Sequence, residues 1–208
     1  MAIPLAKKWS KGLRAFLVWR TNHIKNKPFV LILSVVIGFL CAVAAYCLKQ
    51  GVHLVESFFV DTLVKQQGQT LFFLLPIIGI IITTLLIKYV IREDTGHGIP
   101  NTLYALSKGN GLISLKRTFS SVITAAFTVG FGGSCGLEGP AVGTTSAIGS
   151  NMSKSLRLNV KTRKLMIGCG AAAALSAIFK APVAAIVFAM EVILLDITTF
   201  SLIPLLLS

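Results

Sequence analysis

Long apolar runs, separated by short polar or glycine-rich breaks, dominate the chain. The runs without a charged residue are Phe29–Leu48, Leu71–Ile87, Thr118–Leu137, Gly139–Ser153, Leu165–Phe179 and Ile197–Ser208. Crossing the hydrocarbon core of a bilayer takes about 20 apolar residues in a helix. Two or three runs reach that length, whereas the others are short and broken by Gly and Pro. The pattern predicts an all-α integral membrane protein with tilted and half-spanning helices.

The breaks between the runs predict where the helices begin and end. We expect helices over residues 28 to about 60, 71–91, 101–107, 115–129, 140–156, 165–178 and 182–195. Turns are expected at Gln66–Thr70 and at Gly109–Gly111, where glycine and polar residues interrupt the apolar pattern. The final apolar segment has no flanking polar anchor. We therefore expect a truncated chain or one part of a larger assembly.

Composition and charge support a membrane protein and give it an orientation. Of the 208 residues 54% are hydrophobic and 13% charged, whereas soluble domains carry roughly a quarter charged residues. The net charge is +13, and basic residues gather in three groups, within 1–27, 88–117 and 154–164. The positive-inside rule assigns these groups to the cytoplasm, which predicts a multi-pass protein of the cell membrane with a cytoplasmic N-terminus. Residues 1–27 form a basic cytoplasmic segment and 28–208 the transmembrane domain.

The remaining composition excludes several function classes. The basic groups lack the aromatic platform of a nucleic-acid surface, so no nucleic-acid partner is expected. The four cysteines, Cys41, Cys47, Cys135 and Cys169, all lie in apolar segments and have neither a CxxC nor a metal-ligand spacing. We interpret them as small buried hydrophobic residues and expect no disulfide, metal ion or cofactor.

Two segments share one design, in which glycine-rich backbone is followed by proline and then by a helix. They are Gly96–Pro100, with the sequence GHGIP, and Gly136–Pro140, with the sequence GLEGP. Proline is pre-organised for the first helical position, and glycine lets backbone approach a ligand closely. A helix N-terminus also presents free N–H groups and the positive end of the helix dipole. Two such ends directed at one point would form an anion site.

Glu138 lies between two charge-free runs, and a carboxylate is costly in that setting unless it has a function. At a helix N-terminus its carboxylate could occupy the place of an anion, so that protonation or rotation of the side chain would open the path. An enzyme using Glu138 as an acid or base would need a second polar partner in the membrane. The sequence offers only Glu191 and His97, so we expect no enzyme.

The two motifs, together with Gly170–Glu191, resemble the CLC family of voltage-gated chloride channels and chloride/proton antiporters. The resemblance covers roughly residues 30–208 and corresponds to the N-terminal half of that fold. It implies the first of two inverted repeats, a homodimer in the lipid bilayer with one pore per subunit, and chloride as the transported ligand. It further implies that Glu138 is the gate. The anion-binding positions that it implies are His97, Gly98, Ile99, Pro100, Gly139, Pro140 and Ala141.

Three positions depart from the family pattern. His97 replaces the usual serine of the first motif, and Leu137 replaces the lysine or arginine before the gate. Val192 stands where proton-coupled members often carry a second glutamate. We therefore expect a chloride channel, while a chloride/proton antiporter and a transporter of another anion, such as fluoride or nitrate, remain open.

Overall fold

The computed structural model describes residues 26–61, 74–92, 98–193 and 199–208, and these ranges contain helices and no strand. The α-helices are α2 Asn26–Val55, α4 Leu75–Leu85, α5 Gly98–Ser107, α6 Arg117–Gly130, α7 Glu138–Ser155, α8 Val160–Phe179, α9 Pro182–Phe188 and α10 Thr199–Leu207. Short π-helical turns extend α2, α4 and α9, namely η1 Glu56–Asp61, η3 Leu86–Ile91 and η4 Ala189–Ile193. The basic segment up to residue 25 and the turn expected at 66–70 lie outside the described residues.

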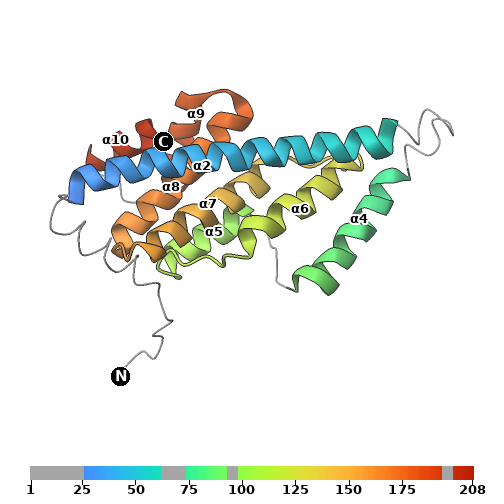
Figure 1. Cartoon of the computed structure of the whole chain (residues 1–208), viewed down its shortest axis with the longest axis horizontal. Coiled ribbons are helices and arrows are strands. Elements are labelled where there is room, and N and C mark those ends of the chain that lie inside the picture. Colours follow the sequence, from blue (N-terminus) through green and yellow to red (C-terminus); the bar gives the residue numbers. More distant parts are fainter. Residues whose placement is uncertain (1–25, 62–73, 93–97, 194–198) are drawn as a thin grey trace, which may run out of the picture.

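Two helices are long and apolar enough to cross a bilayer, judged by length and composition. One is α2 with its π-helical extension, and the other is α8. Figure 1 shows α2 running the length of the molecule across α6, α7 and α8. α2 buries Ile37 and Cys41 on one face and leaves Phe39 and Tyr46 largely exposed on another. The prediction of one continuous helix to about residue 60 is confirmed.

The core lies where α7 and α8 pack with their backbones in close contact. α8 is buried continuously from Leu165 to Leu175, a stretch made largely of alanine and glycine. A methyl group added at Gly170 would lie only 2.7 Å from the carbonyl oxygen of Thr145 on α7. The Cys41 thiol of α2 donates to the same carbonyl, with a sulfur–oxygen distance of 3.8 Å. The small residues of α8 therefore permit close packing of its backbone against α7.

α5 and α7 lie side by side and run in the same direction. Gly98 at the start of α5 contacts Gly139 at the start of α7, and the loop after α5 contacts the last turns of α7. Ser150 Oγ donates to the Gly111 carbonyl at 2.6 Å and accepts from the Ile113 N–H at 3.0 Å. Asn151 Nδ2 donates to the Ile113 carbonyl at 3.2 Å. This loop contains the turn expected at 109–111, so that prediction is confirmed.

The helices α5, α7 and α8 begin earlier than predicted. α5 begins at Gly98 and α7 at Glu138, so each starts two residues before its proline, Pro100 or Pro140. Proline is accommodated at the third position because the N–H groups of the first turn have no partner within the helix. α8 begins at Val160, within the basic stretch expected to be a turn, because Asn159 caps it by accepting from the Thr162 N–H at 2.7 Å.

The prediction that all four cysteines are buried was wrong for two of them. Cys41 and Cys169 are buried, whereas Cys47 and Cys135 are exposed. Cys47 follows the exposed Tyr46 on the outward side of α2, and Cys135 lies in the loop between α6 and α7 rather than in a helix. All four thiols are free. An apolar sequence neighbourhood therefore did not imply burial within the chain.

Candidate anion site

The N-termini of α5 and α7 meet through their backbones. A methyl group in place of a Gly98 hydrogen would overlap the carbonyl oxygen of Gly139. The point of closest approach therefore requires glycine at Gly98, whereas a methyl group at Gly139 would meet no atom within 4 Å. Each helix brings the positive end of its dipole and the N–H groups of its first turn to this junction. Two partial positive charges therefore lie together here, and none of the described residues that line this place has a cationic side chain.

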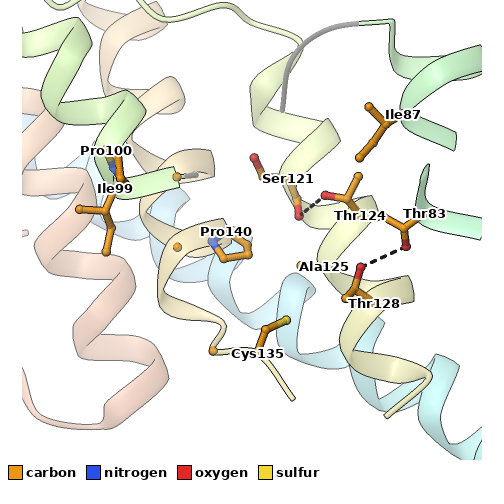
Figure 2. A pocket seen from close by; sticks show the side chains of 13 residues that line it. Thr83, Ile87, Ile99, Pro100, Ser121, Thr124, Ala125, Thr128, Cys135 and Pro140 are labelled. Carbon is orange, nitrogen blue, oxygen red and sulfur yellow. Dashed lines mark hydrogen bonds between the residues drawn. The ribbon is translucent and has the colours of Figure 1, made fainter. Parts of the chain in front are cut away.

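A cavity of about 750 Å³ opens at this junction. One wall comes from the helix starts, including Ile99, Pro100 and Pro140, and the opposite wall from α6 and α4 (Figure 2). The lining is mainly apolar, and its side-chain hydroxyls come from Thr83, Ser121, Thr124 and Thr128. Among the described residues, no charged side chain lines the cavity. Backbone dipoles and hydroxyl groups are therefore the means by which these walls can stabilise a ligand.

The hydroxyl groups of α6 form a row on the face that borders the cavity. Ser121, Thr124 and Thr128 are three and four residues apart, which places them on one side of the helix. Thr124 Oγ1 donates to the Ser120 carbonyl at 2.9 Å, and Thr128 Oγ1 donates to Thr83 Oγ1 of α4 at 3.0 Å. The second bond joins α6 to α4 across the cavity wall (Figure 2).

Glu138 is the first residue of α7 and is partly buried. Its carboxylate folds back over Gly136, where an added side chain would overlap it. Gly136 and Cys135 line the cavity, so the carboxylate lies beside the wall without forming part of it. A negative charge in the first turn is favourable at the positive end of a helix dipole. No salt bridge joins Glu138 to another described residue within 4.0 Å.

The structure places most of the predicted anion-binding positions on the cavity. Gly98, Ile99, Pro100, Gly139 and Pro140 line it. Whether they bind an anion stays a prediction. His97 lies outside the described residues.

Ala141, the remaining predicted position of the second motif, does not line the cavity. It is 1% exposed and packs in the core with Leu48, Ala125 and Ala174. Its N–H donates to the Leu137 carbonyl at 3.0 Å, the first hydrogen bond of the helix. The Ala141 N–H is therefore not among the free donors, which belong to the residues before it.

Sequence reasoning missed the α6 and α4 wall of the cavity. The signal was a row of hydroxyl residues, Ser121, Thr124 and Thr128, at helical spacing within the apolar run Thr118–Leu137. Nothing in the sequence pairs this row with Thr83, because that contact depends on how α4 packs against α6. Cys135 was considered only as a hydrophobic residue, yet its thiol lines the cavity.

Two other residues weighed in the sequence lie apart from the cavity walls. Glu191 is exposed in the π-helical turn after α9. Val192 packs against the apolar cluster that also receives Ile99 of α5. No three residues among the described His, Cys, Asp and Glu are grouped as metal ligands would be.

This geometry, two helix N-termini meeting at a hydroxyl-lined cavity, defines a helical protein with a candidate anion site. The family model described as voltage gated chloride channel matches residues 78–208. The chain therefore belongs to this family, the CLC family of the resemblance described above.

Individual relatives agree with the family model. The H(+)/Cl(-) exchange transporter ClcA of Vibrio cholerae is 33% identical over 176 residues, which cover 79% of this chain and 36% of that protein. A protein of Ralstonia nicotianae that is named ClcB-like is 31% identical over 139 residues, which cover 65% of this chain and 32% of that protein. The chloride channel protein CLC-e of Arabidopsis thaliana is 26% identical over 169 residues, covering 76% and 23%. The chain thus spans about a third or less of these relatives' lengths.

Proposed function

We propose that this chain belongs to a multi-pass membrane protein that conducts anions, chloride foremost, along a path through the cavity, with Glu138 as its gate. The observation that carries the proposal is the contact between Gly98 and Gly139, which brings two helix N-termini together at a cavity that no charged side chain of the described residues lines. Each N-terminus is equivalent to roughly half a positive charge. Partial charges attract an anion yet allow it to leave, which conduction requires.

The membrane setting rests on the length and surface of the helices. α2 and α8 meet the requirement for crossing a bilayer, and α2 exposes large apolar side chains such as Phe39 and Tyr46. The shorter α5 and α7 start at the cavity and continue as half-spanning helices, the design expected where backbone lines a transport path. We assign the chain to the first of two inverted repeats, with residues 1–27 cytoplasmic and 28–208 in the transmembrane domain. A homodimer in the lipid bilayer is part of the same proposal.

Glu138 acts as the gate because it competes with the anion. Its carboxylate belongs to the first residue of α7, where the helix dipole favours any negative charge. The same carboxylate lies over Gly136 at the cavity wall, so rotation about its side-chain bonds brings it into or out of the path. Protonation removes the negative charge and weakens this competition. Rotation of the Glu138 side chain and its protonation both let the anion reach the free N–H groups.

Conduction through a channel is the leading form of transport, and chloride/proton exchange is the second. Val192 packs in an apolar cluster, so this position provides no carboxylate for a proton. The Vibrio cholerae relative, however, is named an exchange transporter, and Glu191 is exposed beside Val192. Exchange remains the alternative for this reason, as does transport of fluoride or nitrate because His97 replaces the family's usual serine.

The test is anion flux from liposomes that contain the protein carrying this chain, with internal pH recorded at the same time. The Glu138→Gln variant should conduct chloride continuously and lose dependence on external pH, because the amide cannot be deprotonated. The matched control is Glu56→Gln, which removes an exposed carboxylate that pairs with His53 at 3.6 Å, away from the cavity.

The outcomes separate the alternatives. Absence of anion flux from the unmodified protein would overturn the proposal as a whole. Loss of flux in Glu138→Gln with intact folding would overturn the gating role. Proton movement against its gradient, driven by chloride, would replace the channel with the exchanger. Relative fluxes of chloride, fluoride and nitrate decide the anion preference.

A further inference from the structure

Ser121 is the one cavity-lining hydroxyl residue of α6 that forms no hydrogen bond through its side chain within the described residues. The Thr124 hydroxyl donates to backbone carbonyls, and the Thr128 hydroxyl donates to Thr83. Ser121 is only 6% exposed, so its hydroxyl is largely withdrawn from solvent. Because Ser121 lines the cavity and its hydroxyl has no partner among the described residues, this hydroxyl can donate a hydrogen bond to a ligand in the cavity.

The position of this hydroxyl identifies the ligand's location. A methyl group added at Gly143 would lie 3.5 Å from Ser121 Oγ and 3.3 Å from the Gly98 Cα. Ser121 Oγ therefore lies close to the junction of the two helix N-termini. Figure 2 shows its side chain on the side of α6 that faces α5 and Pro140. The free hydroxyl and the free N–H groups of the first turns border the same space.

We propose that the Ser121 hydroxyl is a direct ligand of the transported anion and sets the preference between strongly and weakly hydrated anions. This inference rests on the proposed function. A small, strongly hydrated anion such as chloride loses more on leaving water than a large one such as thiocyanate, and it needs directed donors to replace that water. The helix dipoles act on any negative charge, whereas a hydroxyl group donates one directed hydrogen bond. Ser121 thus adds discrimination to an otherwise unselective attraction.

The experiment compares Ser121→Ala, Ser121→Thr and the control Ser120→Ala in the protein that carries this chain. Ser120 is 4% exposed, immediately precedes Ser121 on α6 and does not line the cavity. Chloride and thiocyanate fluxes from liposomes give the selectivity, and titration calorimetry in detergent gives chloride affinity. Ser121→Ala should lower chloride affinity roughly tenfold, because one hydrogen bond to a charged group is lost. Its chloride-to-thiocyanate flux ratio should fall, while Ser121→Thr and Ser120→Ala keep both values.

Each outcome bears on a different claim. If the unmodified protein carries anions and Ser121→Ala keeps the flux ratio and chloride affinity, Ser121 is not a ligand and this inference fails alone. If Ser120→Ala matches Ser121→Ala, the effect comes from the packing of α6, which also overturns it. Absence of anion flux from the unmodified protein instead overturns the proposed function. Thermal unfolding of each variant in detergent confirms that the compared proteins are folded.

Discussion

The two ends of the α5–α7 pair are built in opposite ways. At the N-terminal end, the helices touch through Gly98 and Gly139, and no side-chain cap bonds the start of α7. At the other end, the Ser150 and Asn151 side chains hold the loop after α5. Nearby, Asn159 caps the start of α8. At the Ser150 end, side chains form hydrogen bonds with the backbone groups. At the Gly98 end, the backbone N–H groups of the first helical turns have no such partners.

The difference shows how a helix pair can be both rigid and able to bind a ligand. Hydrogen bonds at the Ser150 end fix the relative position of α5 and α7, so the free N–H groups at the cavity need no side chain to hold them in place. Uncapped helix starts usually lose stability, and a bound anion can restore part of it. We expect substitutions at the cavity end to alter transport and those at the other end to alter mainly stability.

The largest effect is expected at the glycine contact. Gly98→Ala should destabilise the protein by roughly 3 kcal/mol, the upper end for overpacking, because the methyl group meets backbone that cannot rotate away. Gly139→Ala is the matched control, since the space around it is open and the added methyl group points to no atom within 4 Å. It should keep the fold. Denaturant unfolding in detergent measures both.

Chloride flux separates the two glycine variants further. Gly139 lines the cavity, so Gly139→Ala should reduce flux while stability is preserved. An unchanged unfolding free energy of Gly98→Ala would mean that Gly98 and Gly139 are not in close contact.

A smaller effect is expected from removing the Ser150 hydrogen bonds at the other end of the α5–α7 pair. Ser150→Ala deletes one donor and one acceptor and leaves the Ile113 N–H and the Gly111 carbonyl without these partners. The expected loss of stability is about 2 kcal/mol. Ser155→Ala, at an exposed position at the end of α7, is the control and should change stability little. Equal unfolding free energies for the two variants would show that the Ser150 hydrogen bonds do not stabilise the loop after α5.

The smallest effect is expected at the start of α8. Asn159→Ala removes the side-chain oxygen that accepts from the Thr162 N–H at 2.7 Å, at a cost of about 1 kcal/mol. Asn159→Ser should keep most of the stability, because serine caps a helix almost as well. Unfolding measurements compare the three proteins, and unchanged chloride flux in both variants is expected. A change in flux would mean that this end also takes part in transport.

Much of the fold followed from local sequence. Apolar runs predicted α2, α6 and α8, and the glycines at 109–111 predicted the turn after α5. Glycine followed by proline predicted where α5 and α7 begin to within three residues. The error arose because proline lacks an N–H group, and the first turn of a helix makes no use of one. Asn159 carried a capping signal that was overlooked inside a basic stretch.

The features that depend on distant packing could not be predicted in the same way. The contact of Gly98 with Gly139 and the bond of Thr128 to Thr83 join residues about forty positions apart in sequence. The burial of Cys41 and the exposure of Cys47 arise from which face of α2 meets α8, and both cysteines lie in the same apolar run. The hydrophobicity of a segment can be taken from its sequence, whereas the burial of each side chain depends on which helix packs against it.

The glycine contact also limits what a conventional mutational scan can detect. Such scans truncate side chains, and the junction of Gly98 with Gly139 has no side-chain atoms to remove. Main-chain atoms alone determine how closely the two helix starts approach each other at this contact. A scan that only removes side-chain atoms would therefore not detect this contact. Only substitutions that add atoms reveal this determinant.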